Sequence, residues 1–301
     1  MLYLIAIIAG VLIATMVTFN GDLTVLYGTY TASAIIFFVG LITSLIISII
    51  KKEKLFQVKK IPFVLYLGGF TGLFTTVFNN VAYGYITVSA ILALSLFGQT
   101  ITSIFIDLFG LFRMPKRGFK PFKIIGLVIV VIGLLFMLYP FNFTKASIIA
   151  IIVSLLSGVS CNISRAMNAA ISDETTLMNS TLWNYATGFL SSLIALLIFG
   201  SINHEPIFSG IFNFTPKIYL FIGGALGAVV ILLTNMIFSK MDTLYATLLL
   251  FSGQVFSGIV IDLIKSGSFD LFLTIGAVLT LLGLVTNLVL ERYKTQKNMV
   301  K

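Results

Sequence analysis

The sequence predicts an all-α membrane protein with ten transmembrane helices. Of its 301 residues, 58% are apolar and only 10% are charged, whereas a soluble domain carries about 25% charged residues. Lipid rather than water must therefore cover most of the surface. Ten segments are long and apolar enough to span a membrane, and the basic residues gather in the short connections between them.

Charged residues, proline and glycine divide the chain into these apolar segments. A spanning helix needs about 20 mostly apolar residues, and it satisfies every backbone polar group within its own segment. The first segment lacks the basic start and the cleavage pattern of a signal peptide, so we expect it to be a spanning helix. The predicted spans are Leu2–Phe19, Tyr30–Ile50, Phe63–Tyr85, Val88–Phe112, Phe122–Tyr139, Ala146–Ile171, Leu177–Gly200, Ile218–Lys240, Thr243–Ile264 and Leu271–Leu290.

Lysine and arginine are distributed unequally between the two ends of these segments. Fifteen of the 19 lie on the side of the N-terminus, three lie on the opposite side, and Arg165 lies inside a span. Cytoplasmic connections of membrane proteins carry the excess of basic residues. We therefore expect both termini in the cytoplasm and a multi-pass location in the cell (plasma) membrane.

Few residues are available for catalytic or metal-binding chemistry. The chain has one cysteine, Cys161, and one histidine, His204, which excludes an internal disulfide and a cysteine-built metal site. Isolated carboxylates and a single histidine do not supply the catalytic cluster of a membrane-embedded enzyme. The formal net charge is +9, but the basic residues occupy loops and the C-terminal tail, which argues against nucleic-acid binding. We expect no cofactor and no metal, and we expect a small-molecule substrate and membrane lipids as partners.

An internal repeat is the most informative feature of the chain. The block YLGGFTGLFTTVFNN from Tyr66, followed by LFGQTITSIFID, returns as FIGGALGAVVILLTN from Phe221, followed by FSGQVFSGIVID. At a constant offset of 155 residues, the matched pairs are Gly68/Gly223, Gly69/Gly224, Gly72/Gly227, Asn80/Asn235, Gly98/Gly253, Gln99/Gln254 and Asp107/Asp262. At offsets of 148 and 150, the flanks add Gly10/Gly158, Asn20/Asn168, Gly126/Gly276 and Gly133/Gly283.

The repeat divides the chain into two units of five predicted spans. We assign residues 1–140 to the first unit, 141–145 to a linker, 146–291 to the second unit and 292–301 to a cytoplasmic tail. Because each unit holds an odd number of spans, the second unit is expected in the opposite orientation. Inverted repeats around a site at the middle of the membrane are common in transporters. The repeated glycines are expected to pack helices, and the last helices of the units either join the units or form a dimer.

At the repeated positions the chain resembles the drug/metabolite transporter superfamily, and more narrowly its YdcZ-type family. The resemblance is carried by Gly98, Gln99 and Asp107, by the Phe-Gly-Leu-Phe run from Phe109, and by the Gly-Gly-x-x-Gly pattern from Gly68. The asparagine that ends the first helix of each unit adds to it. Single-unit members of the family look like one five-helix half, so the resemblance implies two fused halves and the transport of small compounds.

The chain departs from the related families in its first helices. The family often carries a glutamine one turn before the asparagine, where this chain has Met16 and Ser164. The related small multidrug transporters use a membrane-embedded glutamate for proton and cation exchange, whereas Ile13, Ala14 and Thr15 occupy that region here. The resemblance therefore does not extend to their antiport mechanism.

Gln99 and Asp107 are eight residues apart, which places them about 80° apart on one side of a helix, with Ser103 between them. Gln254 and Asp262 repeat this pattern in the second unit. A buried amide near mid-span needs partners, so we expect both glutamines in the substrate pathway. The aspartates either gate the pathway or carry protons, or they cap neighbouring helices, and the capping role is favoured.

Arg165 has no charged counterpart, because Val17 stands at the matched position. A charge inside a span costs about 3 kcal/mol or more and by default indicates function. Its guanidinium could attract an anionic group or pair with Asp107. The alternative is that it extends toward Asp173 and Glu174 at the end of its helix, and this alternative is slightly favoured.

Polar and aromatic residues complete the candidate site. Four repeated asparagines either cross-link helices or line a wet cavity, and the Trp-Asn-Tyr run from Trp183 supplies a stacking wall or an interfacial anchor. The predicted pathway residues are Gln99, Gln254, Asn80, Asn235, Asn20, Asn168, Ser103, Trp183, Tyr185 and Arg165, and the candidate gating or proton-coupling residues are Asp107 and Asp262.

These features predict a secondary active transporter that exports a small organic metabolite or drug-like compound by alternating access. Two alternatives remain open. The first is a passive channel or lipid scramblase, which would show non-saturating flux without coupling. The second is a non-transporting membrane scaffold. The sequence leaves monomer and homodimer undecided.

Overall fold

The computed structural model describes residues 2–114, 116, 121, 123–139, 143–205, 218–240 and 243–299. These residues form helices joined by short connections, which confirms the all-α class. The α-helices are α1 (Leu2–Tyr27), α2 (Thr29–Ile50), α3 (Gly68–Ala82), α4 (Val88–Phe109), α5 (Lys123–Leu138), α6 (Lys145–Glu174), α7 (Leu177–Ala195), α9 (Ile222–Lys240), α10 (Thr243–Ser266) and α11 (Leu271–Met299). The short helices are η1 (Phe63–Leu67), η2 (Leu111–Arg113), η3 (Leu196–Gly200) and η4 (Ile218–Phe221).

Some helices are longer than the predicted segments. α1 continues through residues 20–22, where the run Asn-Gly-Asp had predicted its end. The helix continues because tertiary contacts cover this run: Gly21 packs directly on the ring of Tyr83. α11 continues to Met299, so most of the stretch assigned to a tail prolongs the last helix.

Six segments of the described chain are long and apolar enough to cross a membrane. They belong to α1, α2, α4, α6, α7 together with η3, and α10. Shorter apolar helices cover Ile124–Leu138, Ile218–Thr234 and Leu271–Asn287. Large apolar side chains cover the outside of these helices, and Ile50 and Ile264 are about three-quarters exposed, at 74% and 75%. A surface of this kind is solvated by lipid.

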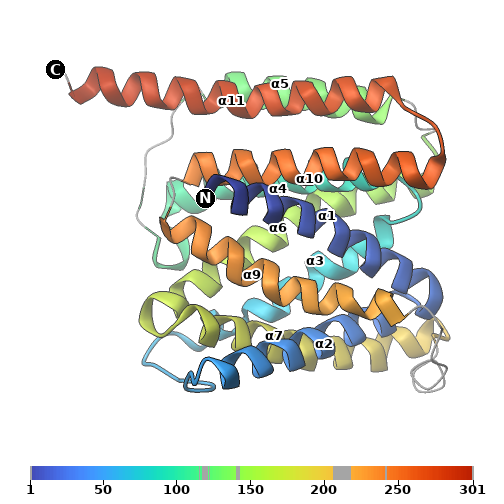
Figure 1. Ribbon diagram of the computed structural model, residues 1–301, viewed down its shortest axis with the longest axis vertical. Helices are drawn as coiled ribbons and strands as arrows, with labels where there is room; N and C mark the ends of the chain where they lie inside the picture. Colours follow the sequence, from blue (N-terminus) through green and yellow to red (C-terminus); the bar gives the residue numbers. More distant parts are fainter. Residues whose placement is uncertain are drawn as a thin grey trace.

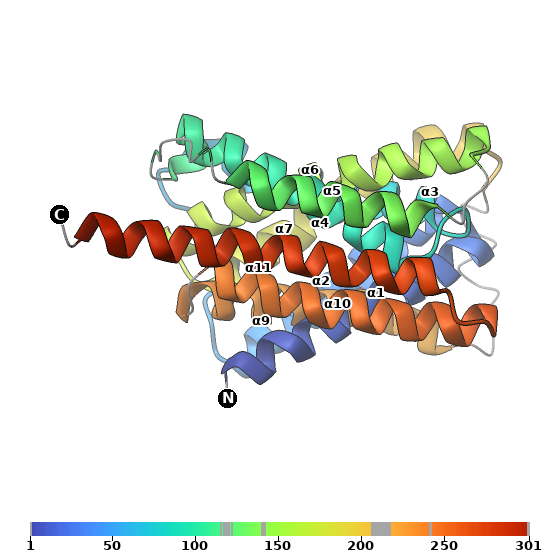
Figure 2. The same ribbon diagram turned by 90° about the horizontal axis from the view of Figure 1, so that it is seen from above.

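The helices run side by side in one bundle (Figure 1). α5 and α11 pair along one edge, α2 and α7 pair along the opposite edge, and the other helices lie between them. The start of α1 and the end of α11 lie at the same end of the bundle (Figure 2). Helices from different halves of the chain pack together: α1 on α9 and α10, α6 on α3 and α4.

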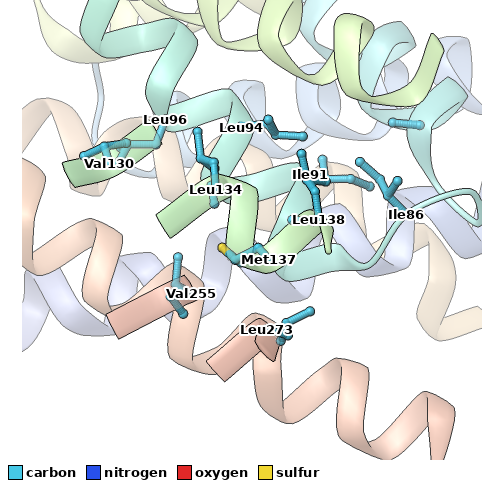
Figure 3. Packing of buried hydrophobic residues seen from close by; sticks show 14 of the residues in the cluster. Ile86, Ile91, Leu94, Leu96, Val130, Leu134, Met137, Leu138, Val255 and Leu273 are labelled. Carbon is cyan, nitrogen blue, oxygen red and sulfur yellow. The ribbon is translucent and has the colours of Figure 1, made fainter. Parts of the chain in front are cut away.

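The largest buried apolar cluster joins α4, α5, α10 and α11 (Figure 3). Ile91 and Leu94 of α4, Met137 of α5, Val255 of α10 and Leu273 of α11 belong to it. Lipid tails are as apolar as these side chains, so close packing rather than the hydrophobic effect favours this contact within a membrane. The cluster holds the α5–α11 pair against the rest of the bundle.

Glycines allow α5 and α11 to approach at backbone distance. A β-carbon built on Gly126 would lie 2.4 Å from the carbonyl oxygen of Gly283, and one built on Gly276 would lie 2.4 Å from that of Gly133. A side chain at any of these four positions would push the helices apart. The predicted packing role of the glycines spaced by seven is confirmed, and the two last helices of the halves join within one chain.

Candidate functional site

A polar stretch of α6, from Asn162 to Asn168, contacts three other helices within two turns. Hydrogen bonds connect it to α3, α4 and α7. The apolar residues Ala14, Met16 and Val17 of α1 stand at the positions matched to Asn162, Ser164 and Arg165, whereas Asn168 is matched by Asn20. Asn162, Ser164 and Arg165 therefore have no polar counterpart in the first half, and the stretch that holds them is the centre of the candidate site.

Asn168 and Asn184 form an amide pair between α6 and α7. Asn168 Nδ2 donates to Asn184 Oδ1 at 2.9 Å, and Ser164 Oγ donates to the backbone oxygen of Gly68 at 2.7 Å. All three side chains are buried. Hydrogen bonds in such a low-dielectric setting are strong, so this network fixes the start of α3 against α6 and α7.

The asparagine of each half packs against a repeated glycine of the other half. Asn168 Oδ1 lies 2.4 Å from a β-carbon built on Gly68, and Asn20 Oδ1 lies 2.2 Å from one built on Gly223. Both oxygens are buried without a hydrogen-bond partner in the described part of the chain. Each lies against the weakly donating Cα–H group of a helix start. This matched contact gives the repeated Asn and Gly positions a common structural role.

The repeated Gly-Gln pairs lie at two matched helix crossings. On α6, a β-carbon built on Gly158 would lie 1.8 Å from the nearest carbonyl oxygen of α4 and 2.9 Å from the backbone nitrogen of Gln99. On α1, a β-carbon built on Gly10 would lie 2.2 Å from the nearest carbonyl oxygen of α10 and 2.9 Å from the nitrogen of Gln254. Both crossings therefore bring backbone into contact with backbone.

Gln99 meets Arg165 beside the crossing of α4 and α6. Arg165 Nη1 donates to Gln99 Oε1 at 2.5 Å, and Gln99 Nε2 donates to Ser95 Oγ at 3.4 Å. Asn162 Nδ2 donates to the backbone oxygen of Gln99 at 3.1 Å. The partner of Arg165 is thus a neutral amide of α4, not Asp107 and not the acidic residues at the end of α6.

Asp262 caps the first turn of α4. Its carboxylate accepts hydrogen bonds from the backbone nitrogens of Val88 (2.8 Å) and Ser89 (2.9 Å) and from the Ser89 hydroxyl (2.5 Å). A carboxylate at this place satisfies donors that the helix leaves free and complements the helix dipole. The matched Asp107 is partly buried, and within the described ranges it forms neither a hydrogen bond nor an ion pair.

Asp22, Tyr83 and Lys265 form a cluster that links the halves near the end of α10. Tyr83 Oη donates to Asp22 Oδ1 at 2.5 Å, and Lys265 Nζ lies 2.6 Å from the same oxygen. Lys265 also contacts the Tyr83 hydroxyl and lies 4.8 Å from the centre of its ring.

Three of the remaining polar candidates, Asn80, Gln254 and Ser103, form no hydrogen bond with the α6 stretch in the described part of the chain. Asn80 is buried in α3 and donates to Ser33 Oγ of α2 at 3.3 Å. Gln254 is buried at the crossing of α1 and α10, and Ser103 is exposed on α4. Asn235 belongs to α9, and its side chain lies outside the described residues. The structure thus joins Gln99 with Arg165 and Asn168 with Asn184, and among the described side chains Asn80, Gln254 and Ser103 form no hydrogen bond with either pair.

Trp183 and Tyr185 occupy different surroundings on α7. Trp183 packs edge-on against Tyr66, with ring centroids 5.0 Å apart, and its Nε1 donates to the backbone oxygen of Gln57 at 3.2 Å. Tyr185 is buried against Phe37, with ring centroids 5.9 Å apart. Trp183 therefore holds the connection between α2 and α3, while Tyr185 fills the contact between α2 and α7.

Glu205 caps α2 and was not among the residues that the sequence singled out. Its carboxylate accepts hydrogen bonds from the backbone nitrogens of Thr29 (2.8 Å), Tyr30 (2.9 Å) and Thr31 (2.9 Å). α2 follows Gly28, which offers no side-chain cap of its own. A helix start without a capping residue was the one signal that an acidic partner elsewhere in the chain was needed.

The site offers amides, hydroxyls and one guanidinium, which are groups that bind and orient a solute. In the ranges that the structure covers, no three His, Cys, Asp or Glu residues lie together as metal ligands would. These polar groups lie between the packed helices α3, α4, α6 and α7.

Comparison with known proteins agrees with the repeat. The family described as "Putative inner membrane exporter, YdcZ" matches the chain in two parts, residues 1–136 and residues 149–286. No curated protein matches the chain. A crystal structure of another protein is similar in fold, with a TM-score of 0.64 and 16% sequence identity over 97% of this chain and 98% of that chain. At this identity the similarity concerns the fold alone.

The two matched parts correspond to the two halves that the internal repeat defines. Together with the apolar helices, they identify a multi-pass protein of the inner (plasma) membrane. The chain belongs to the YdcZ family, with one matched part in each half.

Proposed function

We propose that the chain is a secondary active transporter that exports a small organic compound by alternating access. Ten helices span the membrane in this proposal, and both termini are cytoplasmic. Residues 1–140 and 146–291 form two units of opposite orientation, joined by residues 141–145. The family description supports export, and the excess of basic residues on the side of the termini supports the orientation.

The observation that carries the proposal is the exchange of matched contacts between the units. Gly158 of α6 meets Gln99 of α4, and Gly10 of α1 meets Gln254 of α10, each with 2.9 Å between a built β-carbon and the glutamine nitrogen. Equivalent contacts made in both directions are what a pseudo-two-fold axis between inverted units requires. Units related in this way can exchange conformations and open a central site to either side.

The two matched aspartates differ in their described contacts. At one end Asp262 caps α4, and a β-carbon built on Gly258 would lie 2.9 Å from the Cα of Ser89. At the other end, the matched Asp107 has no partner in the described chain, and Ser103 is exposed. In this proposal, transport exchanges the arrangements of the two ends.

Reconstitution tests the proposal. Proteoliposomes that contain the purified protein are loaded with a mixture of small organic metabolites, and mass spectrometry identifies what appears outside. We expect saturable release that depends on an ion gradient. Release that rises without saturation and without coupling would indicate a passive channel instead.

The pathway is tested by a Gln99→Ala, Gln254→Ala double variant. Loss of a polar contact to the solute costs about 1–3 kcal/mol, so release should slow by about tenfold or more. Thr100→Ala is the matched control, because the Thr100 hydroxyl donates to its own helix at 2.9 Å. A double variant that folds and transports normally would remove the glutamines from the pathway.

A further inference from the structure

Arg165 carries a charge inside a predicted span, and it has no oppositely charged partner in the described part of the chain. Its side chain is partly buried, and its guanidinium donates to the neutral Gln99 Oε1 at 2.5 Å. A charge in this position is costly unless another group compensates it. A single amide oxygen does not neutralise it, so the site is short of one negative charge.

The carboxylates closest to Arg165 along α4 and α6 do not supply that charge. Glu174 pairs with Arg113 at 2.8 Å, and Asp173 is exposed at the end of α6. Asp107 lies two turns beyond Gln99 on α4 and forms no ion pair with any described residue. A guanidinium has five N–H donors, and Arg165 uses Nη1 on Gln99, so donors remain for another group.

The arginine is an addition to the duplicated scaffold. Val17 stands at the matched position of α1, so Gln254 has no cation facing it from there. Gln99 is held in place by Ser95 and Asn162, which leaves its oxygen free to orient the guanidinium. A pre-oriented cation that is present in one unit only has the features of a specificity group rather than of a packing group.

We propose that Arg165, oriented by Gln99, binds the carboxylate or phosphate group of the compound that the protein exports. The inference rests on the proposed transport function and names its substrate class, small organic anions. The planar guanidinium binds two oxygens of such a group at once. A bound anion would neutralise the site, so the loaded protein changes conformation without an unpaired charge between its helices.

Cys161 offers a test that needs no knowledge of the substrate. It is the single cysteine of the chain, is partly buried, and precedes Arg165 by one helical turn. Side chains at this spacing lie about 5–6 Å apart. Purified protein in nanodiscs is treated with an anionic sulfonatoethyl methanethiosulfonate or with the cationic trimethylammonium analogue. The rate at which each reagent modifies Cys161 is divided by the rate at which it modifies a free thiol in solution. A cation beside an accessible thiol should favour the anionic reagent by about tenfold.

Three variants test whether Arg165 causes the preference of Cys161 for the anionic reagent. Arg165→Gln should abolish it, Arg165→Lys should keep it, and Arg113→Gln should leave it unchanged because Arg113 lies in an exposed pair at the helix ends. Equal normalised rates in the wild-type protein would overturn the proposal. So would complete protection of Cys161 in folded wild-type protein, or a preference that survives in Arg165→Gln. Should Arg165→Gln fail to fold, the wild-type rates and Arg165→Lys still decide.

Two protection arms identify the source of the anion. Benzoate in the buffer, with benzamide as its neutral control, should slow the labelling of Cys161 if a soluble anion binds. Slower labelling only when phosphatidylglycerol replaces neutral lipid would assign the site to a lipid headgroup, and protection by neither would overturn the anion site. If transport is saturable but Cys161 shows no preference for the anionic reagent, this inference alone is refuted. If Cys161 shows the preference but transport is not saturable, the proposed function is refuted.

Discussion

Replacing Gly158 with alanine should destabilise the protein by about 1–3 kcal/mol and abolish transport, because it separates α6 from α4. The new β-carbon would lie 1.8 Å from the Ser95 carbonyl oxygen, and a backbone atom of a packed helix cannot rotate away as a side chain can. Thermal unfolding of the purified variant in detergent, followed by reconstitution, measures both effects. The same loss is expected for Gly10→Ala at the matched crossing of α1 and α10, where the shortest distance is 2.2 Å.

Gly72→Ala is the control for this experiment. Gly72 belongs to the repeated Gly-Gly-x-x-Gly pattern, but the nearest atom to its built β-carbon is Ser164 Oγ at 3.4 Å, an ordinary contact. Its stability should therefore stay within about 0.5 kcal/mol of wild type. If Gly158→Ala were as stable as wild type, or if Gly72→Ala lost as much stability as Gly158→Ala, the helix crossings would not be as close as described.

Replacing Asp262 with alanine should lower the free energy of unfolding by about 2 kcal/mol. The change leaves the backbone donors of Val88 and Ser89 without their acceptor at the start of α4. Asparagine caps helices about as well as aspartate, so Asp262→Asn should keep most of the stability. Thermal unfolding compares the two variants, and amide hydrogen exchange at residues 88 and 89 reports the cap itself.

The same variants separate capping from proton coupling. A capping residue needs an oxygen acceptor, whereas a proton carrier needs a titratable carboxyl group. If Asp262 only caps, Asp262→Asn transports with the wild-type dependence on a pH gradient. Loss of that dependence in a stable Asp262→Asn variant would give Asp262 a coupling role. Asp107→Ala is the control for stability, because Asp107 has no partner in the described chain and should lose little.

The helices could be predicted because lipid imposes a simple rule on the sequence, and each predicted span coincides with a helix in the described residues. The end of α1 was wrong because propensity at residues 20–22 was overridden by packing against Tyr83. The last helix was longer than expected because a polar sequence does not by itself end a helix. These errors concern boundaries, where local signals compete with tertiary contacts.

The site could be predicted in part. The repeat identified Gln99, Asn168 and Asp262 as special positions, but it could not show that Gln99 faces Arg165. That contact depends on how α4 crosses α6, which the sequence does not state. Glu205 was missed because its importance comes from the uncapped start of α2, more than 170 residues earlier in the chain.

Accessibility at two matched positions tests most directly whether the two units have opposite orientations. Leu111 and Ser266 are 155 residues apart, follow the repeated aspartates at the same spacing, and are both exposed. Leu111→Cys and Ser266→Cys, each made together with Cys161→Ser, are treated with a membrane-impermeant maleimide in right-side-out and inside-out vesicles. Inverted units predict that position 111 is labelled from the cytoplasmic side and position 266 from the opposite side. Labelling of both positions from the same side would contradict the inverted repeat and, with it, the alternating-access proposal.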